Sequence, residues 1–338
     1  MRVGAVDLGT NSTRLLVADA RGEELEEVER LLEITRLGDR VDTDGRLSDA
    51  AMELVHGALD RYAARAAELG TERVRATATS AVRDAANGRE FLAEVGRRHG
   101  FETRLLSGRE EAELTYRGVT SRLAAGPGTL VCDIGGGSTE LVLGGPDGVV
   151  DAISLDIGCV RMSERCLHGD PPSAAELAAL RRAVAEILPE ALTSAVRTLV
   201  GVAGTITTLA AIDLDLEHEV PELVDGHRLT RSTVEALLER LAALPLAERR
   251  SVRGLMPERT PTIVAGTAIA AEVMRATGAE TMVVSERDIL LGAALAAADP
   301  RGARQLVLAR VVELVDTGDL KSPSPHGERE FESRPGHS

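Results

Sequence analysis

Two carboxylates flank a run of glycines in the stretch DIGGGSTE at residues 133–140. Apolar residues precede and follow this stretch, a pattern that predicts two strands joined by a tight turn. Glycine leaves backbone N–H groups open to a bulky anion, because no side chain blocks the approach. Asp133 and Glu140 could hold a hard cation or a water beside that anion. The stretch therefore suits a phosphate site, although an ordinary glycine-rich hairpin would show the same pattern.

A second stretch near the N-terminus repeats this arrangement. Residues 3–13 read VGAVDLGTNST, in which a strand-like run ends in Asp7 and a turn of small and hydroxyl residues follows. A third glycine turn, GVAGT at 201–205, follows another strand-like run and opens an apolar segment. Two units of strand, aspartate and turn predict two related halves that face one phosphate-bearing ligand.

Three motifs together resemble the exopolyphosphatase/guanosine pentaphosphate phosphatase (Ppx/GppA) family of the actin-like ATPase-domain superfamily. They are DLGTNS at 7–12, SGREEAEL at 107–114 and DIGGGSTEL at 133–141. The resemblance implies an α/β protein of two actin-like (ribonuclease H-like) domains with a cleft between them. The combination of the three motifs makes the resemblance specific, whereas any single glycine turn would not.

We place the two domains at residues 1–125 and 126–300, with the segment Gly-Pro-Gly at 126–128 as their boundary. The histidine–aspartate motif that longer family members carry after this point is missing, so the chain resembles the short, two-domain form. Residues 311–338 lack apolar periodicity and are rich in Pro, Ser, Gly and charge. We expect them to be a disordered tail.

Glu111 and Arg83 are the catalytic residues that the resemblance implies. Glu111 falls on the second glutamate of the family's SGxEEA motif, where it would deprotonate the attacking water. Arg83 falls where the family has an arginine that helps to bind substrate phosphate. Without the resemblance both would be read as structural, because helix dipoles favour first-turn glutamates and helix arginines are commonly solvated. Glu110 has a structural explanation, since Ser107 and Glu110 form a capping box.

The predicted phosphate site combines the three glycine turns with one arginine of a G-x-V-R turn: Gly9, Thr10, Asn11, Ser12, Gly135, Gly136, Gly137, Ser138, Arg161, Gly204 and Thr205. The predicted metal ligands are Asp133, Glu140 and Asp7, with Mg²⁺ as the expected ion. Mn²⁺ is the alternative ion, and a monovalent cation is a further candidate for the site.

Strand and helix patterns alternate along both halves, which is typical of α/β layers. Strands are predicted at 2–8, 13–18, 26–34, 73–77, 149–155 and 281–284. Helices are predicted from Ser48 to about Leu69, from Ser107 onward, from Ser173 to about Val196, and at 232–244, 261–277 and 286–298.

The net charge of −15 argues against general affinity for nucleic acid or membrane. It does not exclude a polyanionic substrate, because local arginines and bound cations can reverse the sign within a cleft. No apolar run approaches the roughly 20 residues of a membrane helix, and no signal-peptide pattern is present. We therefore expect a cytoplasmic protein.

The function that follows is a metal-dependent hydrolase that removes terminal phosphate from inorganic polyphosphate, with short chains as the expected substrate. One alternative is hydrolysis of guanosine pentaphosphate, which shares the terminal phosphoanhydride. The other is a non-enzymatic sensor that binds guanosine tetraphosphate or polyphosphate in the same cleft. A sensor would not need a water-activating Glu111. The resemblance also implies a homodimer.

Overall fold

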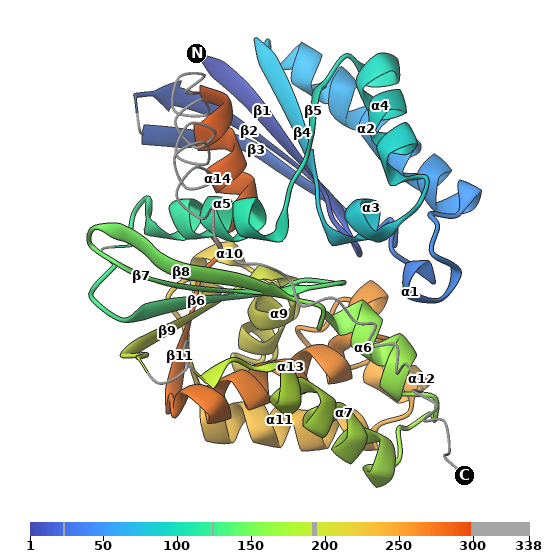
Figure 1. The fold of residues 1–338 in the computed structure, drawn as a ribbon, viewed down its shortest axis with the longest axis vertical. Helices are drawn as coiled ribbons and strands as arrows, with labels where there is room; N and C mark the ends of the chain where they lie inside the picture. The colour runs from blue at the N-terminus through green and yellow to red at the C-terminus, as the bar shows by residue number, and fades with distance from the viewer. Residues whose placement is uncertain (23, 124, 191–194, 299–338) are drawn as a thin grey trace, which may run out of the picture. The chain divides into compact units, whose positions relative to one another are not determined.

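The computed structural model describes residues 1–22, 24–123, 125–190 and 195–298 (Figure 1). The predicted tail at 311–338 lies outside these residues, as does the predicted domain end at residue 300. No helix in the described ranges combines the length and apolar character that a bilayer span requires. The cytoplasmic location and the homodimer stay predictions.

The N-terminal part of the chain forms a five-stranded sheet in the order β3-β2-β1-β4-β5. Its strands are β1 (Arg2–Leu8), β2 (Thr13–Arg21), β3 (Glu24–Glu33), β4 (Arg73–Ala78) and β5 (Glu102–Leu105). The first three strands are antiparallel neighbours, whereas β4 and β5 run parallel to β1. Strand β1 is buried from Val3 to Leu8, because both of its faces are covered by packed elements.

A second sheet of six strands has the order β10-β11-β9-β6-β7-β8. Its strands are β6 (Thr129–Ile134), β7 (Thr139–Gly145), β8 (Gly148–Leu155), β9 (Thr198–Val202), β10 (Arg228–Thr230) and β11 (Thr281–Val284). Strands β6, β7 and β8 are again antiparallel, and β9 and β11 run parallel to β6. Apart from the edge strand β10, the two sheets share one topology. This duplication confirms the predicted fold class of two actin-like domains.

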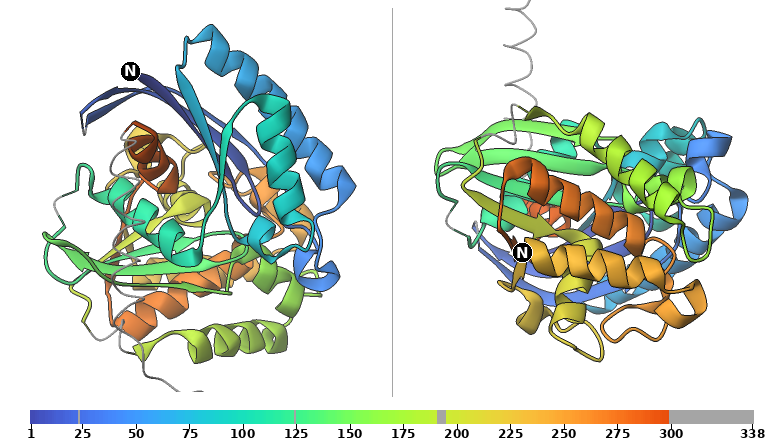
Figure 2. Two further views of the ribbon diagram at one scale, coloured as in Figure 1. Left: turned by 45° about the horizontal axis from the view of Figure 1, so that its top comes forward. Right: turned by 90° about the horizontal axis from the view of Figure 1, so that it is seen from below.

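Helices cover the outer faces of both sheets. On the first sheet these are α2 (Asp49–Glu68) and α4 (Gly88–His99), with the short α1 (Val41–Asp44) and α3 (Ser80–Asp84). On the second they are α7 (Ala174–Ile187), α9 (Ala203–Asp213), α11 (Arg231–Ala243) and α13 (Ile263–Thr277). Shorter helices are α6 (Cys159–Cys166), α10 (Pro221–Val224), α12 (Leu246–Arg249) and the 3₁₀ turn η1 (Pro257–Arg259). Helices α7, α13 and α11 lie side by side in the right view of Figure 2.

Two further helices, α5 (Gly108–Thr120) and α14 (Ile289–Ala298), cover the inner faces of the sheets. Helix α14 packs on β1 and β2 of the first sheet, although it is the last described element of the chain. Helix α5 packs on the second sheet through Ala112, Tyr116 and Val119. The two helices also touch each other, and neither Gly118 nor Gly292 leaves space there for a Cβ atom. The domain boundary at 125/126 stays a prediction.

The local predictions agree with this structure at most positions. Ser48 caps α2, and Ser107 and Ser173 each form the predicted capping box with a glutamate three residues on. The prediction of a helix from Ser173 to about Val196 was wrong at its far end. Helix α7 ends at Ile187 because Pro189 disfavours helical geometry at the residue before it.

Candidate active site

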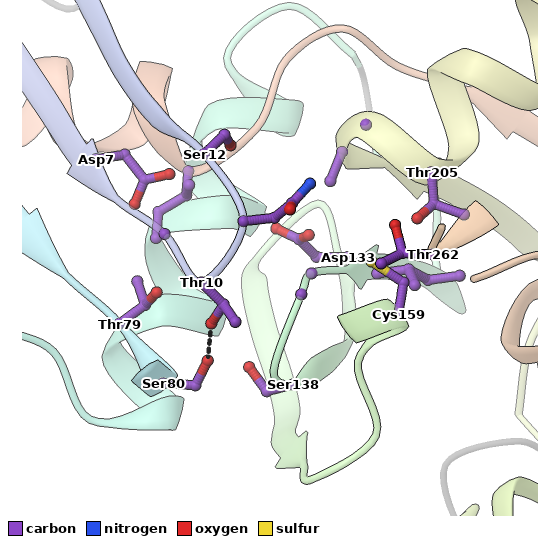
Figure 3. Close-up of a pocket in the computed structure, with 18 of the residues that line it drawn as sticks. Asp7, Thr10, Ser12, Thr79, Ser80, Asp133, Ser138, Cys159, Thr205 and Thr262 are labelled. Carbon is purple, nitrogen blue, oxygen red and sulfur yellow. Dashed lines mark hydrogen bonds between the residues drawn. The ribbon is translucent and has the colours of Figure 1, made fainter. Parts of the chain in front are cut away.

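A pocket lies where the β1–β2 and β6–β7 turns meet (Figure 3). Most of the predicted site residues line it: Asp7, Gly9, Thr10, Asn11, Ser12, Glu111, Asp133, Gly135, Gly136, Ser138, Glu140, Gly204 and Thr205. The two turns touch at Gly136, where a Cβ atom would lie 2.8 Å from the Cβ of Thr10 and 3.2 Å from the backbone nitrogen of Asn11. Glycine is therefore required for the two domains to present their turns to one pocket.

The two turns have the same internal geometry. The N–H of Gly9 donates to the carbonyl of Ser12 at 3.0 Å, and the N–H of Gly135 donates to the carbonyl of Ser138 at 3.0 Å. This repetition is the structural counterpart of the repeated sequence pattern. Below the first turn, the hydroxyls of Thr10 and Ser80 are 2.9 Å apart, which brings the start of α3 to the pocket (Figure 3).

Four carboxylates lie in the pocket wall, and all four are buried: Asp7, Glu111, Asp133 and Glu140. Burial raises the pKa of Glu111 well above its usual value, and the nearby charge of Glu140 raises it further. Burial and the charge of Glu140 likewise raise the pKa of Asp133. A cluster of this kind favours uptake of protons or cations, because several negative charges share a dry site.

Each of three carboxylates is held by a neighbouring donor. Arg83 Nη1 lies 3.1 Å from Glu111 Oε2. The hydroxyl of Thr115 donates to Asp133 Oδ2 at 3.2 Å, and the hydroxyl of Ser154 donates to Glu140 Oε1 at 2.7 Å. These contacts fix the positions of the carboxylates before any ligand binds.

Asp7 belongs to a buried ion-pair network. Its Oδ2 accepts hydrogen bonds from Arg14 Nε at 3.1 Å and Nη2 at 2.7 Å, and the same guanidinium pairs with Asp288. Asp7 Oδ1 is buried without a hydrogen-bond partner among the described residues. Burial raises the pKa of Asp7 despite the arginine. One oxygen of this carboxylate is therefore available to a ligand.

Three predicted site residues lie outside the pocket wall. Arg83 sits behind Glu111 and also donates to the carbonyl of Leu106 at 3.0 Å. Gly137 and Arg161 line a smaller neighbouring pocket instead. Arg161 donates to the carbonyl of Gly137 at 2.7 Å and pairs with Asp42 and Asp84 of the first domain. In this arrangement Arg161 joins the two domains and its guanidinium is not presented to the pocket.

The sequence analysis does not identify three further residues at or beside the pocket: Arg14, Asp288 and Arg259. Arg14 could have been found, because the tight turn at 9–12 sets a hairpin register that places Arg14 opposite Asp7. Asp288 and Arg259 reach the site only through the packing of α14 and η1, and nothing in their local sequence indicates it.

Fold and pocket together define a two-domain α/β protein of the actin-like class with its pocket between the domains. The model of the Ppx/GppA phosphatase family matches residues 16–292, so the chain belongs to that family. It is 40% identical over 316 residues to Exopolyphosphatase 2 of Mycobacterium tuberculosis, which covers 88% of this chain and 98% of that protein.

Two solved structures are also similar. A Ppx/GppA family member of Aquifex aeolicus is 30% identical with a TM-score of 0.75, and the match covers 93% of this chain and 98% of that one. An exopolyphosphatase of Cytophaga hutchinsonii is 25% identical with a TM-score of 0.80, and the match covers 86% of this chain and 96% of that one. These likenesses confirm the family that the motifs predicted.

Proposed function

We propose that this protein is an exopolyphosphatase, which hydrolyses the terminal phosphoanhydride bond of inorganic polyphosphate and releases orthophosphate. Its family and its exopolyphosphatase relatives support a hydrolase of such bonds. The observation that carries the proposal is the position of Glu111, a buried carboxylate that faces the two glycine turns from the start of α5.

Glu111 acts as the general base. Its side chain lines the pocket, and its raised pKa brings its proton affinity closer to neutral pH, where a general base is most effective. Arg83 holds one oxygen of the carboxylate and keeps the group from becoming wholly protonated. The other oxygen takes the proton of the water that attacks the terminal phosphorus. Arg83 is thus a positioning residue for Glu111.

The glycine turns bind the terminal phosphoryl group. Backbone N–H groups of Thr10 and Asn11 on one turn, and of Gly136 and Ser138 on the other, supply donors without bulky side chains. Such fixed donors stabilise the charge that spreads over the transferring oxygens, because they need no reorganisation during the reaction.

The carboxylates fit a divalent cation. Asp7 Oδ1 is buried without a partner among the described residues, and Asp133 and Glu140 add further hard oxygen donors. Within the described residues, no three His, Cys, Asp or Glu side chains form a metal site by themselves. Mg²⁺ commonly takes one or two carboxylates and completes its shell with phosphate oxygens and water. We assign Asp7 and Asp133 to Mg²⁺, with Glu140 acting through water, and the ion would neutralise phosphoryl charge when bound.

A phosphate-release assay with Mg²⁺ tests this function. The substrates are inorganic polyphosphates of defined length and guanosine pentaphosphate, compared by kcat/KM. The proposal predicts orthophosphate release from polyphosphate, with short chains preferred. Release of orthophosphate from guanosine pentaphosphate alone would identify this nucleotide, and not polyphosphate, as the substrate. Tight binding of both compounds without any release would favour a non-enzymatic sensor.

A further inference from the structure

The first glycine turn is held from behind by the segment at residues 36–42. The N–H of Arg36 donates to the carbonyl of Asn11 at 3.0 Å, and the N–H of Gly38 donates to the carbonyl of Thr10 at 2.8 Å. A Cβ atom on Gly38 would overlap the side chain of Thr10, so this close approach requires a glycine. The segment is therefore attached to the turn, and a displacement of one displaces the other.

The second glycine turn is held from behind in the same manner by the start of α6. The N–H groups of Cys159 and Val160 donate to the carbonyls of Gly135 at 2.9 Å and Gly136 at 2.8 Å. The first N–H groups of a helix have no partner within it, so the turn supplies their acceptors. A Cβ atom on Gly158 would overlap the backbone of Gly136, which again shows how closely the two segments pack.

These two supporting segments meet in a cluster of ion pairs that joins the domains. Arg161 Nη1 lies 2.5 Å from Asp42 Oδ1, and the Nη2 of the same guanidinium pairs with Asp84. Arg165, one turn further along α6, pairs with Asp42 as well, with its Nε 2.5 Å from Oδ2. Arg161 Nε donates to the carbonyl of Gly137 at 2.7 Å. One guanidinium thus contacts the second glycine turn and two aspartates of the first domain.

We call Asp42, Asp84, Arg161 and Arg165 the interdomain bridge. The side chain of Arg161 is only 11% exposed and that of Asp42 19%, so their ion pair is less screened by water than a surface pair. The chain passes between the two sheets after α5 and before α14. The bridge joins α6 to α1 and α3 on the other side of the molecule (Figure 1), where the domains could otherwise move apart.

Helix α3 connects the bridge to the proposed general base. Arg83 and Asp84 are consecutive residues at the end of this five-residue helix. Arg83 Nη1 lies 3.1 Å from Glu111 Oε2, while Asp84 pairs with Arg161. The same short helix therefore holds the base with one side chain and the second glycine turn, through Arg161, with the next. The position of the turn relative to the base depends on both contacts.

We propose that Asp42 and Asp84 are positioning residues, which act through Arg161 to align the second glycine turn with the first turn and with Glu111. Neither aspartate belongs to the described pocket wall, so neither touches the substrate. The terminal phosphoryl group has to contact both turns while water lies between it and the base, so a small displacement of one turn misaligns the reacting groups. This inference rests on the proposed exopolyphosphatase function and deepens it, because it assigns the alignment of that site to residues outside it.

The double variant Asp42→Asn/Asp84→Asn tests this role, because it removes both charges and keeps the size of the side chains. Its kcat for polyphosphate should fall by about tenfold to hundredfold at a temperature well below its melting temperature, as expected for misaligned reacting groups. The matched control is Asp44→Asn, since Asp44 lies in the same helix as Asp42 and pairs with Arg40 of its own domain. The kcat of this control should equal that of the wild type.

Hydrogen exchange measured by mass spectrometry tests the same coupling without substrate. In the double variant the amides at residues 159–161 should exchange about tenfold faster than in the wild type, because the start of α6 loses its support from the first domain. Both substitutions lie in the first domain, so a role confined to that domain would leave these amides unchanged. Unchanged exchange at 159–161 would therefore overturn the proposal. The control Asp44→Asn should show the exchange of the wild type.

The kinetic results can also overturn the proposal. An unchanged kcat in the double variant would do so, as would a fall in KM at unchanged kcat, which would show that a released Arg161 binds substrate itself. If the double variant does not fold, Arg161→Lys decides. An ammonium group cannot contact the carbonyl of Gly137 and both aspartates at once, so kcat should fall, and an unchanged kcat overturns the proposal.

The exchange experiment separates this proposal from the proposed function. A wild-type protein that releases no phosphate, together with faster exchange at 159–161 in the double variant, would leave the role of the bridge standing and refute only the exopolyphosphatase function.

Discussion

Replacing Glu111 by glutamine removes the proposed general base and should leave the fold intact. Glutamine keeps the size of the side chain and an oxygen that can accept the hydrogen bond from Arg83. It cannot take a proton from water, so kcat should fall by about 10²–10⁴-fold. KM should stay unchanged or fall, because one negative charge near a polyanion is removed. The assay is orthophosphate release from polyphosphate under saturating conditions.

The same substitution should not weaken the fold. The pKa of Glu111 is raised in the folded state, so this group favours folding below its unfolded pKa and opposes it as the pH rises toward the folded pKa. Each unit of that rise corresponds to about 1.4 kcal/mol of stability lost at high pH. Glu111→Gln removes this loss, so its melting temperature at neutral pH should equal or exceed that of the wild type.

The neighbouring glutamate supplies the control. Glu110 accepts hydrogen bonds from the backbone N–H of Ser107 at 2.8 Å and from its hydroxyl at 2.7 Å, as a capping box requires. Glutamine also serves in such a box, so Glu110→Gln should change turnover only slightly. Equal losses of kcat in the two variants, or a loss in Glu111→Gln that follows unfolding, would refute the assignment of Glu111 as the base.

Two further predictions concern arginines of the site. Arg83→Met removes the hydrogen bond and charge that lower the pKa of Glu111, so the acid limb of the pH profile of kcat/KM should move to higher pH; an unmoved limb would separate Arg83 from the base. Arg14→Met leaves two buried aspartates without their shared partner and should lower the free energy of unfolding by about 3–5 kcal/mol in a urea titration. A loss below about 1 kcal/mol would show that the network is not a buried ion pair in solution.

Much of the fold and most of the pocket could be predicted because they depend on short-range patterns. The strand, aspartate and glycine turn recur at residues 7–12 and 133–138, and the turns that result have the same hydrogen bond. The capping box at Ser107 distinguishes Glu110 from Glu111 without any tertiary information. Each of these features is set by residues a few positions apart, so spacing alone identifies them.

The parts that could not be predicted depend on contacts between distant segments. The sequence predicts Arg161 at the phosphate, whereas in the structure it pairs with Asp42 and Asp84 of the other domain. Arg259 meets Gly204 only because η1 packs against the start of α9. The same limit explains why the sequence of α14 does not indicate that this helix packs on the first sheet.

Hydrolysis in water enriched in ¹⁸O shows which phosphorus is attacked, because the attacking oxygen stays bound to that phosphorus. In the proposed mechanism Glu111 directs water at the terminal phosphoryl group, which binds to the glycine turns. Full-length protein with Mg²⁺ and inorganic polyphosphate should therefore release orthophosphate that carries one ¹⁸O from solvent, while the shortened chain carries none. Label in the shortened chain would place the attack at the penultimate phosphorus, and an absence of orthophosphate would contradict the function itself.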